Sequence, residues 1–411
     1  MLIKYEFLKI IRRKSTIIIM LVSLLITAFF FTLPIVSFQT YTQDGAIRGA
    51  AGIAYEKDQA TKISIPLTEE FITATIENYQ ELFENPDNIG YDGNEQFIIG
   101  DAYWNYVAPI ENLLIRTIAR TYDRPNESAG LSKIQDMDLR NGANYYERRN
   151  EKIEELLNME NRGISENQKE YWRNINSGVD TPFQYGYYDG WVIIFTSFEL
   201  LMFAILAVCI VLAPTFSGEY QAGTDAVILA AKYGKTKLIT AKILSSFLFG
   251  FLAFTLHLTV AFGVTLAAFG TDGWNLPLQI WNTLIPYPFT FLQAVLINTA
   301  VNYTIQLAAI GLTLLLSAKM KSPYLVLMII VPVLFIPLFI PPNGPTNLYN
   351  MIVCLLPNHA ATAEIHRNRY ISYEIGSFII DVHAMRAIVY MALTLIAIPF
   401  ARIGFNKHQV S

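Results

Sequence analysis

FSGEYQAGTDAVILAAKYGKTKLITAK, residues 216–242, is a short charged segment between two long apolar runs. Four lysines lie within its last eleven residues: Lys232, Lys235, Lys237 and Lys242. A short lysine-rich loop between two apolar runs is typical of the cytoplasmic side of a membrane protein. The stretch therefore predicts a polytopic membrane fold and the side on which this loop lies.

The composition of the whole chain supports a membrane class. Of 411 residues, 53% are hydrophobic and only 16% are charged, whereas soluble domains carry about 25% charged residues. Residues 38–190 hold 26 acidic and 14 basic residues, and the rest of the chain holds 8 acidic and 16 basic ones. This asymmetry predicts two environments. The acidic region lacks cysteine, so it is not a disulfide scaffold.

Six apolar runs approach the roughly 20 residues that a membrane-spanning helix needs. Their predicted bounds are 16–38, 191–214, 243–269, 289–318, 324–340 and 384–401. The fifth and sixth runs are close to the lower length limit. The first run is too long for the core of a signal peptide and is interpreted as a retained signal anchor.

Basic residues set the orientation of these runs. They precede the first run and follow the second, fourth and sixth, so alternating spans bring all of them to one side, the cytoplasm. We therefore expect a protein of the plasma membrane with both termini inside, a cytoplasmic loop at 215–242 and a cytoplasmic tail at 402–411. Residues 39–190 would be extracellular, as would the outer segment 341–383, for which a re-entrant element at the outer leaflet is the open alternative.

Residues 1–15 place apolar side chains at helical spacing against lysine and arginine. This pattern favours an amphipathic helix in the cytoplasmic interface over a simple start of the first span. The periodicity of residues 39–190 predicts a mostly helical domain, with breaks near 85–94 and 123–130. Aromatic residues at 182–191 are interpreted as a belt at the outer interface. The predicted fold is an all-α polytopic membrane protein with six transmembrane helices and a mostly helical extracellular domain.

The charged loop itself contains helix signals. Thr224 is a predicted N-cap, Asp225 suits the positive end of a helix, Lys232 suits its negative end and Gly234 is a predicted stop. These signals predict a helix of about nine residues, 225–233, with an apolar middle. Such a helix at the cytoplasmic face requires a protein partner or the lipid interface.

The pattern Phe-x-x-Glu-x-x-x-Gly-Thr, followed by an apolar stretch, a basic patch and Ala-Lys before the next span, resembles the ABC-2 type transporter permeases of bacteria. The matching positions are Phe216, Glu219, Gly223, Thr224, Gly234, Lys235, Lys237 and Lys242. In that family the loop holds a coupling helix that seats on an ATPase subunit. The resemblance assigns ATPase coupling to these positions together with Asp225. The long first outer loop departs from compact members and is similar to a Gram-positive subgroup.

The resemblance also implies partners and cargo. It implies two cytoplasmic ABC ATPase subunits, a second permease copy or a paralogue, and export of a peptide, an antimicrobial or a lipid-like molecule. ATP and Mg would be bound by the ATPase partner. A phosphate-binding loop ending at Gly234-Lys235-Thr236 would need glycine where this chain has Leu229, so no nucleotide site is expected here. We expect no enzymatic activity in this chain and no nucleic-acid partner.

Polar side chains inside the apolar runs are candidates for a transport pathway. Glu199 lies in the second run, where a charge is costly and functional by default. Asn298, Asn302 and Gln306 recur every four residues on the fourth run, so they share one helix face. Such a seam either lines a pathway or joins helices by amide hydrogen bonds. The spacing of His359, His366 and His383 is not that of a metal site, and no metal is expected.

Two other function classes remain open on the sequence. The large outer domain would also suit a sensor or immunity protein that binds an extracellular ligand without transport. An integral-membrane enzyme is disfavoured, because the central spans contain no evident catalytic pair.

Overall fold

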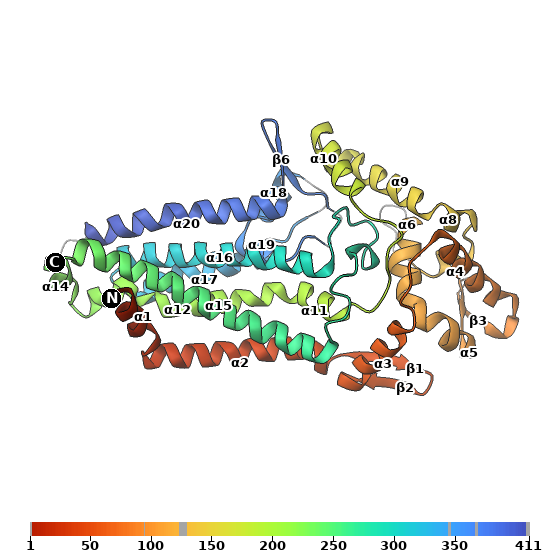
Figure 1. Cartoon of the computed structure of the whole chain (residues 1–411), viewed down its shortest axis with the longest axis horizontal. Coiled ribbons are helices and arrows are strands. Elements are labelled where there is room, and N and C mark those ends of the chain that lie inside the picture. The colour runs from red at the N-terminus through yellow and green to blue at the C-terminus, as the bar shows by residue number, and fades with distance from the viewer. Residues whose placement is uncertain (1, 94, 123–129, 344–346, 366–368, 408–411) are drawn as a thin grey trace.

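The computed structural model describes residues 2–93, 95–122, 130–343, 347–365 and 369–407. Long helices form an elongated bundle, and a second helical region extends from one end of it (Figure 1). The helix α1 (Leu2–Ile11), the short helix α14 (Asp225–Ala230) and the last turns of α20 (Val382–Asn406) lie at the opposite end. We call this the basic end and the other the outer end.

Among the described residues, five helical segments are long and apolar enough to cross a membrane by length and composition: Lys14–Val36, Asp189–Gln221, Gly234–Phe269, Phe291–Lys319 and Val382–Asn406. They contain the following elements: α2 (Lys14–Val36), α11 (Asp189–Ser197), η7 (Phe198–Leu201), α12 (Met202–Leu212), α13 (Pro214–Gln221), η8 (Gly234–Leu238), α15 (Ile239–Phe269), α16 (Phe291–Lys319) and α20. The predicted span 324–340 corresponds to a shorter apolar helix, Pro323–Phe339, made of α17 (Pro323–Phe335) and η10 (Ile336–Phe339). The chain is thus a mostly helical protein with five candidate spans, and the six-span topology stays a prediction.

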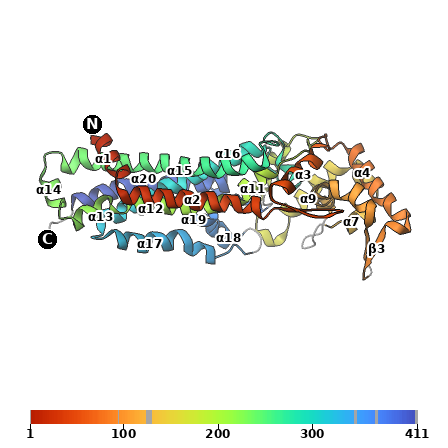
Figure 2. The same ribbon diagram turned by 90° about the horizontal axis from the view of Figure 1, so that it is seen from below.

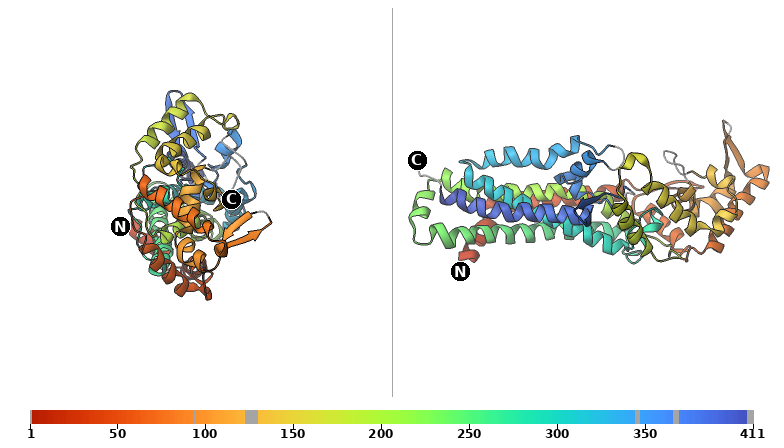
Figure 3. Two further views of the ribbon diagram at one scale, coloured as in Figure 1. Left: turned by 90° about the vertical axis from the view of Figure 1, so that its right-hand side faces the viewer. Right: turned by 90° about the horizontal axis from the view of Figure 1, so that it is seen from above.

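The helix α16 forms the centre of the bundle, where it contacts α12, α15, α17 and α20. It packs most extensively on α20, and Gly311 permits this close approach. A Cβ atom at Gly311 would lie 3.1 Å from the Cβ of Ala397. The helix α17 lies at the edge of the bundle when it is viewed from below and from above (Figures 2 and 3).

In the described part of the chain, the outer region combines helices with three antiparallel hairpins that the sequence did not predict. Its main helices are α3 (Gly49–Thr61), α4 (Glu69–Glu81), α9 (Tyr145–Leu157) and α10 (Glu166–Ser177), where Ser165 and Gln168 form a capping box. Its shorter elements are η1 (Leu82–Glu84), η2 (Pro86–Asn88), α5 (Gly100–Ala102), η3 (Tyr103–Val107), η4 (Ala108–Ile110), η5 (Leu113–Ala119), α6 (Arg120–Tyr122), α7 (Ser132–Gln135), α8 (Arg140–Ala143) and η6 (Glu160–Arg162). The hairpins pair β1 (Gln39–Thr42) with β2 (Gly45–Arg48), β3 (Ile89–Asp92) with β4 (Glu95–Ile98), and β5 (Ser372–Ile375) with β6 (Phe378–Asp381).

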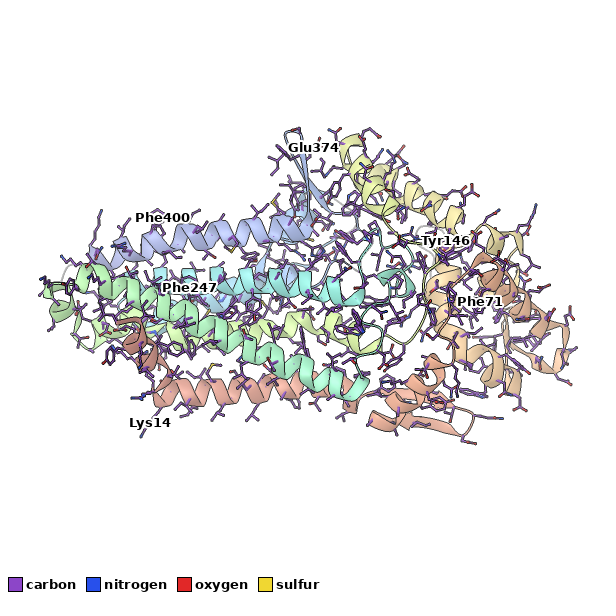
Figure 4. The ribbon with its side chains drawn as sticks, viewed as in Figure 1. Lys14, Phe71, Tyr146, Phe247, Glu374 and Phe400 are labelled. Carbon is purple, nitrogen blue, oxygen red and sulfur yellow. The ribbon has the colours of Figure 1, made fainter. Side chains whose placement is uncertain are left out.

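Residues 341–383, the predicted outer segment, fold into α18 (Leu348–Val353), α19 (Pro357–Ala361) and the β5–β6 hairpin. Figure 4 places Glu374 on this hairpin beside α10. The helix α19 packs against α16 and α17. Residues 344–346 and 366–368 of this segment, which include His366, lie outside the described residues, as do 123–129 and 408–411.

The buried apolar side chains form two main clusters. The larger one runs without a break from the outer region into the bundle and includes Leu67, Trp172, Phe291 and Tyr390. The other lies at the basic end and joins α1, α13, α15 and the last turns of α20 through Ile10, Phe216, Ile239 and Phe405.

The aromatic stretch 182–191 belongs to the larger cluster. Phe183, Tyr185, Tyr188 and Trp191 are all buried, and the Trp191 Nε1 donates to the Asp272 carbonyl at 2.9 Å. The predicted aromatic belt is therefore wrong, because these rings pack inside the protein where the outer region joins the bundle.

Candidate functional site

A buried ion-pair network of four residues joins three helices, α1, α13 and α15, at the basic end. The Glu219 Oε1 on α13 accepts hydrogen bonds from the Lys9 Nζ on α1 at 2.7 Å and from the Lys242 Nζ on α15 at 2.8 Å. The same Lys242 ammonium reaches the Glu6 Oε2 at 3.0 Å. Lys242 is 2% exposed and Glu219 is 7% exposed. Two carboxylates thus balance two ammonium groups, as a buried charged group requires.

The turn after α13 is fixed by Glu219 and by a glycine. Gly223 has φ of +64°, the left-handed conformation that glycine adopts at the end of a helix. The Thr224 backbone N–H donates to the Glu219 carbonyl at 3.0 Å, and its hydroxyl donates to the Glu219 Oε2. Thr224 occupies the predicted N-cap position of α14, but its side chain makes no cap hydrogen bond there, because its hydroxyl binds the carboxylate of the preceding helix.

The helix α14 is shorter than predicted, since it ends at Ala230 rather than 233. Gly234 is buried, and a Cβ atom there would lie 1.6 Å from the Ile228 carbonyl oxygen. Gly234, the first residue of the π-helical turn η8, thus allows the chain to pass close to α14, rather than acting as the predicted helix stop. Asp225, at the first position of α14, is buried.

The outward side of this loop combines apolar and cationic groups. Val227 is 73% exposed and Tyr233 is 46% exposed. Lys237 lies over the Tyr233 ring at 4.6 Å from its centroid, and Lys235 is exposed beside it. Exposed apolar side chains and exposed lysines in one short segment are suited to bind an acidic, partly apolar protein groove. We call the exposed surface formed by Val227, Tyr233, Lys235 and Lys237 the α14 tip.

Phe216 lies inside the protein rather than on this surface. It is fully buried against Phe405 on α20, with ring centroids 4.8 Å apart. The Phe216 and Ser217 backbone N–H groups both donate to the Ser317 Oγ on α16 at 3.0 Å, and Ser317 donates to the Ala213 carbonyl at 2.6 Å. Ser317, which sequence reasoning did not single out, thereby ties the start of α13 to the central helix α16.

The predicted intramembrane polar residues lie near the other end of α16. The side-chain amides of Asn298 and Asn302 both donate to the Ala361 carbonyl at the end of α19, at 3.2 and 3.1 Å. Gln306 is fully buried one turn further along. Glu199 is exposed, and its Oε2 accepts from Thr362 at 3.4 Å. Because the Asn298 and Asn302 amides on α16 bond to a backbone carbonyl at the end of α19, they fit the interpretation that the seam joins helices.

Arg386, which sequence reasoning also missed, completes this junction. Its guanidinium is fully buried and donates to the carbonyls of Cys354, Thr362 and His359, each at 2.9 Å. These carbonyls lie at the ends of α18 and α19, where helical backbone leaves acceptors without intrahelical partners. The sequence did offer a signal for Arg386, because an arginine near the start of an apolar run is costly to bury without partners. The predicted site residues thus form two separate groups: the coupling residues at the basic end and the polar residues beside α19. On α16, Ser317 marks the first group and Asn302 the second, and the 15 residues between them correspond to about 22 Å of helix.

The family model described as ABC-2 family transporter protein matches residues 1–403. The chain is a member of the ABC-2 transporter family. No curated protein and no solved structure gives a significant match. Members of this family are membrane components of transporters and generally work with a cytoplasmic ABC ATPase. In this ABC-2 chain the lysine-rich loop lies with α1 and the last turns of α20 at the basic end of the bundle, and the outer region extends from the opposite end (Figure 1).

Proposed function

We propose that this chain is the permease subunit of an ABC exporter and that the α14 tip is its contact with the ATPase. The Glu219 network carries the proposal, because it fixes a short, partly apolar and cationic helix at the end of the bundle. On this helix the exposed Val227, together with Tyr233 and the neighbouring lysines, offers a partner both an apolar and a cationic contact.

Coupling would pass through Glu219. A displacement of α14 by the ATPase is transmitted to α13 through Thr224 and the Gly223 turn, and from Glu219 to α1 and α15 through Lys9 and Lys242. Because Lys242 has two acceptors and Glu219 has two cationic partners, each buried charge can keep a partner while these helices shift against one another. The three spans that begin or end at this network would then change their packing at the basic end.

The basic end would face the cytoplasm of the cell that carries this protein in its plasma membrane, and residues 39–190 would be extracellular. Two ATPase subunits would bind beneath two permease chains, either copies or paralogues, and would supply the ATP and Mg sites. Peptides, antimicrobials and lipid-like molecules are the cargo classes in keeping with the family. Glu199 and the seam of Asn298, Asn302 and Gln306 would lie toward the extracellular half of the path.

The test is purification of the tagged chain in mild detergent from its native cells, followed by mass spectrometry and an ATPase assay. The proposal predicts a soluble ATPase in stoichiometric amount and ATP hydrolysis by the complex. The matched variants are Val227→Asp, on the α14 tip, and Tyr91→Asp, exposed on β3 at the outer end. Only Val227→Asp should lose the ATPase. Recovery of the chain alone would overturn the proposal.

A sensor role for the outer region is the second candidate. The observation in its favour is that the outer region shares one continuous core with the bundle, so a ligand bound outside would act on the spans. A sensor would respond to its ligand without any co-purified ATPase, and the same purification separates the two functions.

A further inference from the structure

An apolar crevice opens between three helices of the bundle. Its floor is α16 and its walls are α17 and α20, and its volume is about 200 Å³. The described residues that line it are apolar except for Tyr390, whose hydroxyl donates to the Leu355 carbonyl at 2.7 Å. A cavity with such a lining has no polar partners to hold water. Its occupant must therefore be apolar.

The depth of the crevice matches one leaflet of a bilayer. It extends along α16 from Ile305 to Leu315, ten residues or about 15 Å of helix. This is half of the roughly 30 Å hydrocarbon core of a membrane. At the far end Pro357 of α19 and Tyr390 line the crevice, and α18 and α19 lie beyond them, so an acyl chain would enter from the basic end.

A cation lies where the headgroup of such a lipid would be. Lys319 follows Leu315 by four residues, so it is on the same face of α16 and about 6 Å nearer the basic end. Lys319 is exposed, and no ion pair or hydrogen bond of its side chain is present within the described residues. Arg402, exposed on α20 at the same end, adds positive charge. Lysine next to an apolar inter-helix groove is suited to bind an anionic headgroup.

We propose that this crevice holds one acyl chain of an anionic phospholipid from the leaflet at the basic end, with its phosphate beside Lys319. The occupied crevice would connect α17, which lies at the edge of the bundle, to α16 and α20. The proposal does not depend on which cargo the protein moves.

Adjacent residues of α20 provide a matched test. Ile396 lines the crevice and is 55% exposed, whereas Leu395 is 65% exposed but does not line it. A tryptophan at 396 fills the crevice, and a tryptophan at 395 faces the surrounding lipid. The wild type, Ile396→Trp, Leu395→Trp and Lys319→Gln would be purified in detergent with equal amounts of phosphatidylglycerol and phosphatidylcholine, and the retained lipids would be quantified by mass spectrometry.

The wild type and Leu395→Trp should retain about one phosphatidylglycerol per chain. Ile396→Trp should retain about tenfold less, because excluding even two methylene groups changes affinity by about that factor. Lys319→Gln should keep a lipid but lose the preference for phosphatidylglycerol. Equal retention by Ile396→Trp and Leu395→Trp would overturn the proposal. So would a loss of dimer confined to Ile396→Trp on size exclusion, since the crevice would then be a contact between two copies.

Discussion

The junction at the outer end and the junction at the basic end both use a buried cation, but the partners differ. At the outer end, Arg149 of α9 is 2% exposed and donates to the Thr283 and Ile285 carbonyls, at 2.6 and 2.9 Å, in the loop between α15 and α16. Burial lowers the pKa of this guanidinium. At the basic end, Lys242 binds the carboxylates of Glu219 and Glu6, which belong to two different helices.

This difference indicates which end can move. Arg149 is bonded to backbone that the larger apolar cluster holds in place, so a rotation of the outer region would leave buried carbonyls without donors. At the basic end Lys242 has two acceptors and Glu219 has two cationic partners, so small shifts exchange one charged contact for another. We infer that the outer region and the adjoining bundle move as one body, while α1, α13 and α14 are the adjustable part.

The largest expected effect separates the two ends by accessibility. Val227→Cys on the α14 tip and Tyr91→Cys on β3 are exposed sites, 73% and 66%, whereas the native Cys209 and Cys354 are buried. A membrane-impermeant maleimide added to intact cells should label Tyr91→Cys fully and Val227→Cys only after permeabilisation. Labelling of both variants in intact cells would place the two ends on the same side and break the comparison.

The next effect is loss of the outer junction. Arg149→Met should destabilise the protein by about 3 kcal/mol or more, because each buried carbonyl left without a donor costs about 1–3 kcal/mol. Arg148→Met is the control, since this neighbouring arginine pairs with Glu151 near the surface. Thermal unfolding followed by the reactivity of the two buried cysteines measures both. Equal melting temperatures for the two variants would show that the junction does not hold the outer region.

At the basic end the effects should be graded by burial. Lys242→Met leaves two carboxylates together and should cost about 3 kcal/mol, whereas Lys9, with a side chain 46% exposed, should cost less than about 1 kcal/mol when replaced by methionine. Transport-coupled ATPase activity should fall in the same order in the reconstituted complex. A Lys9→Met variant as damaging as Lys242→Met would contradict the assignment of the buried pair as the centre of the network.

The smallest expected effect is at the surface of the outer junction. Lys57 on α3 pairs with Asp272 at 2.5 Å, and its hydrogen bond lowers the pKa of Asp272. The pKa of Asp272 is lower in the folded protein than in the unfolded chain, where it is about 3.9. The ion pair therefore stabilises the protein fully at pH values above about 3.9, and this stabilisation is lost as the pH falls through the folded-state pKa. Both groups are well exposed, so the contribution is below about 1 kcal/mol. The difference in melting temperature between wild type and Asp272→Asn should shrink from pH 7 to pH 3; a constant difference would reject the linkage.

The sequence predicted the features that are encoded within one continuous stretch of residues. Extended apolar runs identify candidate spans directly, and the resemblance of one loop to the ABC-2 permeases singles out Glu219, Gly223 and Lys242. The burial of Glu219 was not visible, because it depends on Lys9, which lies 210 residues earlier in the chain. The local sequence predicted that Thr224 caps α14, but it could not show that the Thr224 hydroxyl bonds to the Glu219 carboxylate instead of capping the helix.

Contacts between distant loops were beyond sequence reasoning. Arg149 is one of several arginines in an acidic region, and nothing local distinguishes it from Arg148. The aromatic residues 182–191 have the composition of an interfacial belt, but the loop between α15 and α16 covers them. Phe400 shows what those rings lack: its side chain points away from the bundle on α20 (Figure 4) and is half exposed, as expected of a ring that faces lipid.

The most direct test of the central claim is photo-crosslinking from the α14 tip in native cells. A photoreactive phenylalanine analogue would replace Val227, and in a second strain Tyr91 at the outer end. We predict a covalent product between position 227 and a soluble ABC ATPase, and no such product from position 91. A position 227 that captures only lipid, or a second copy of this chain, would contradict the claim that the Glu219 network presents α14 to an ATPase.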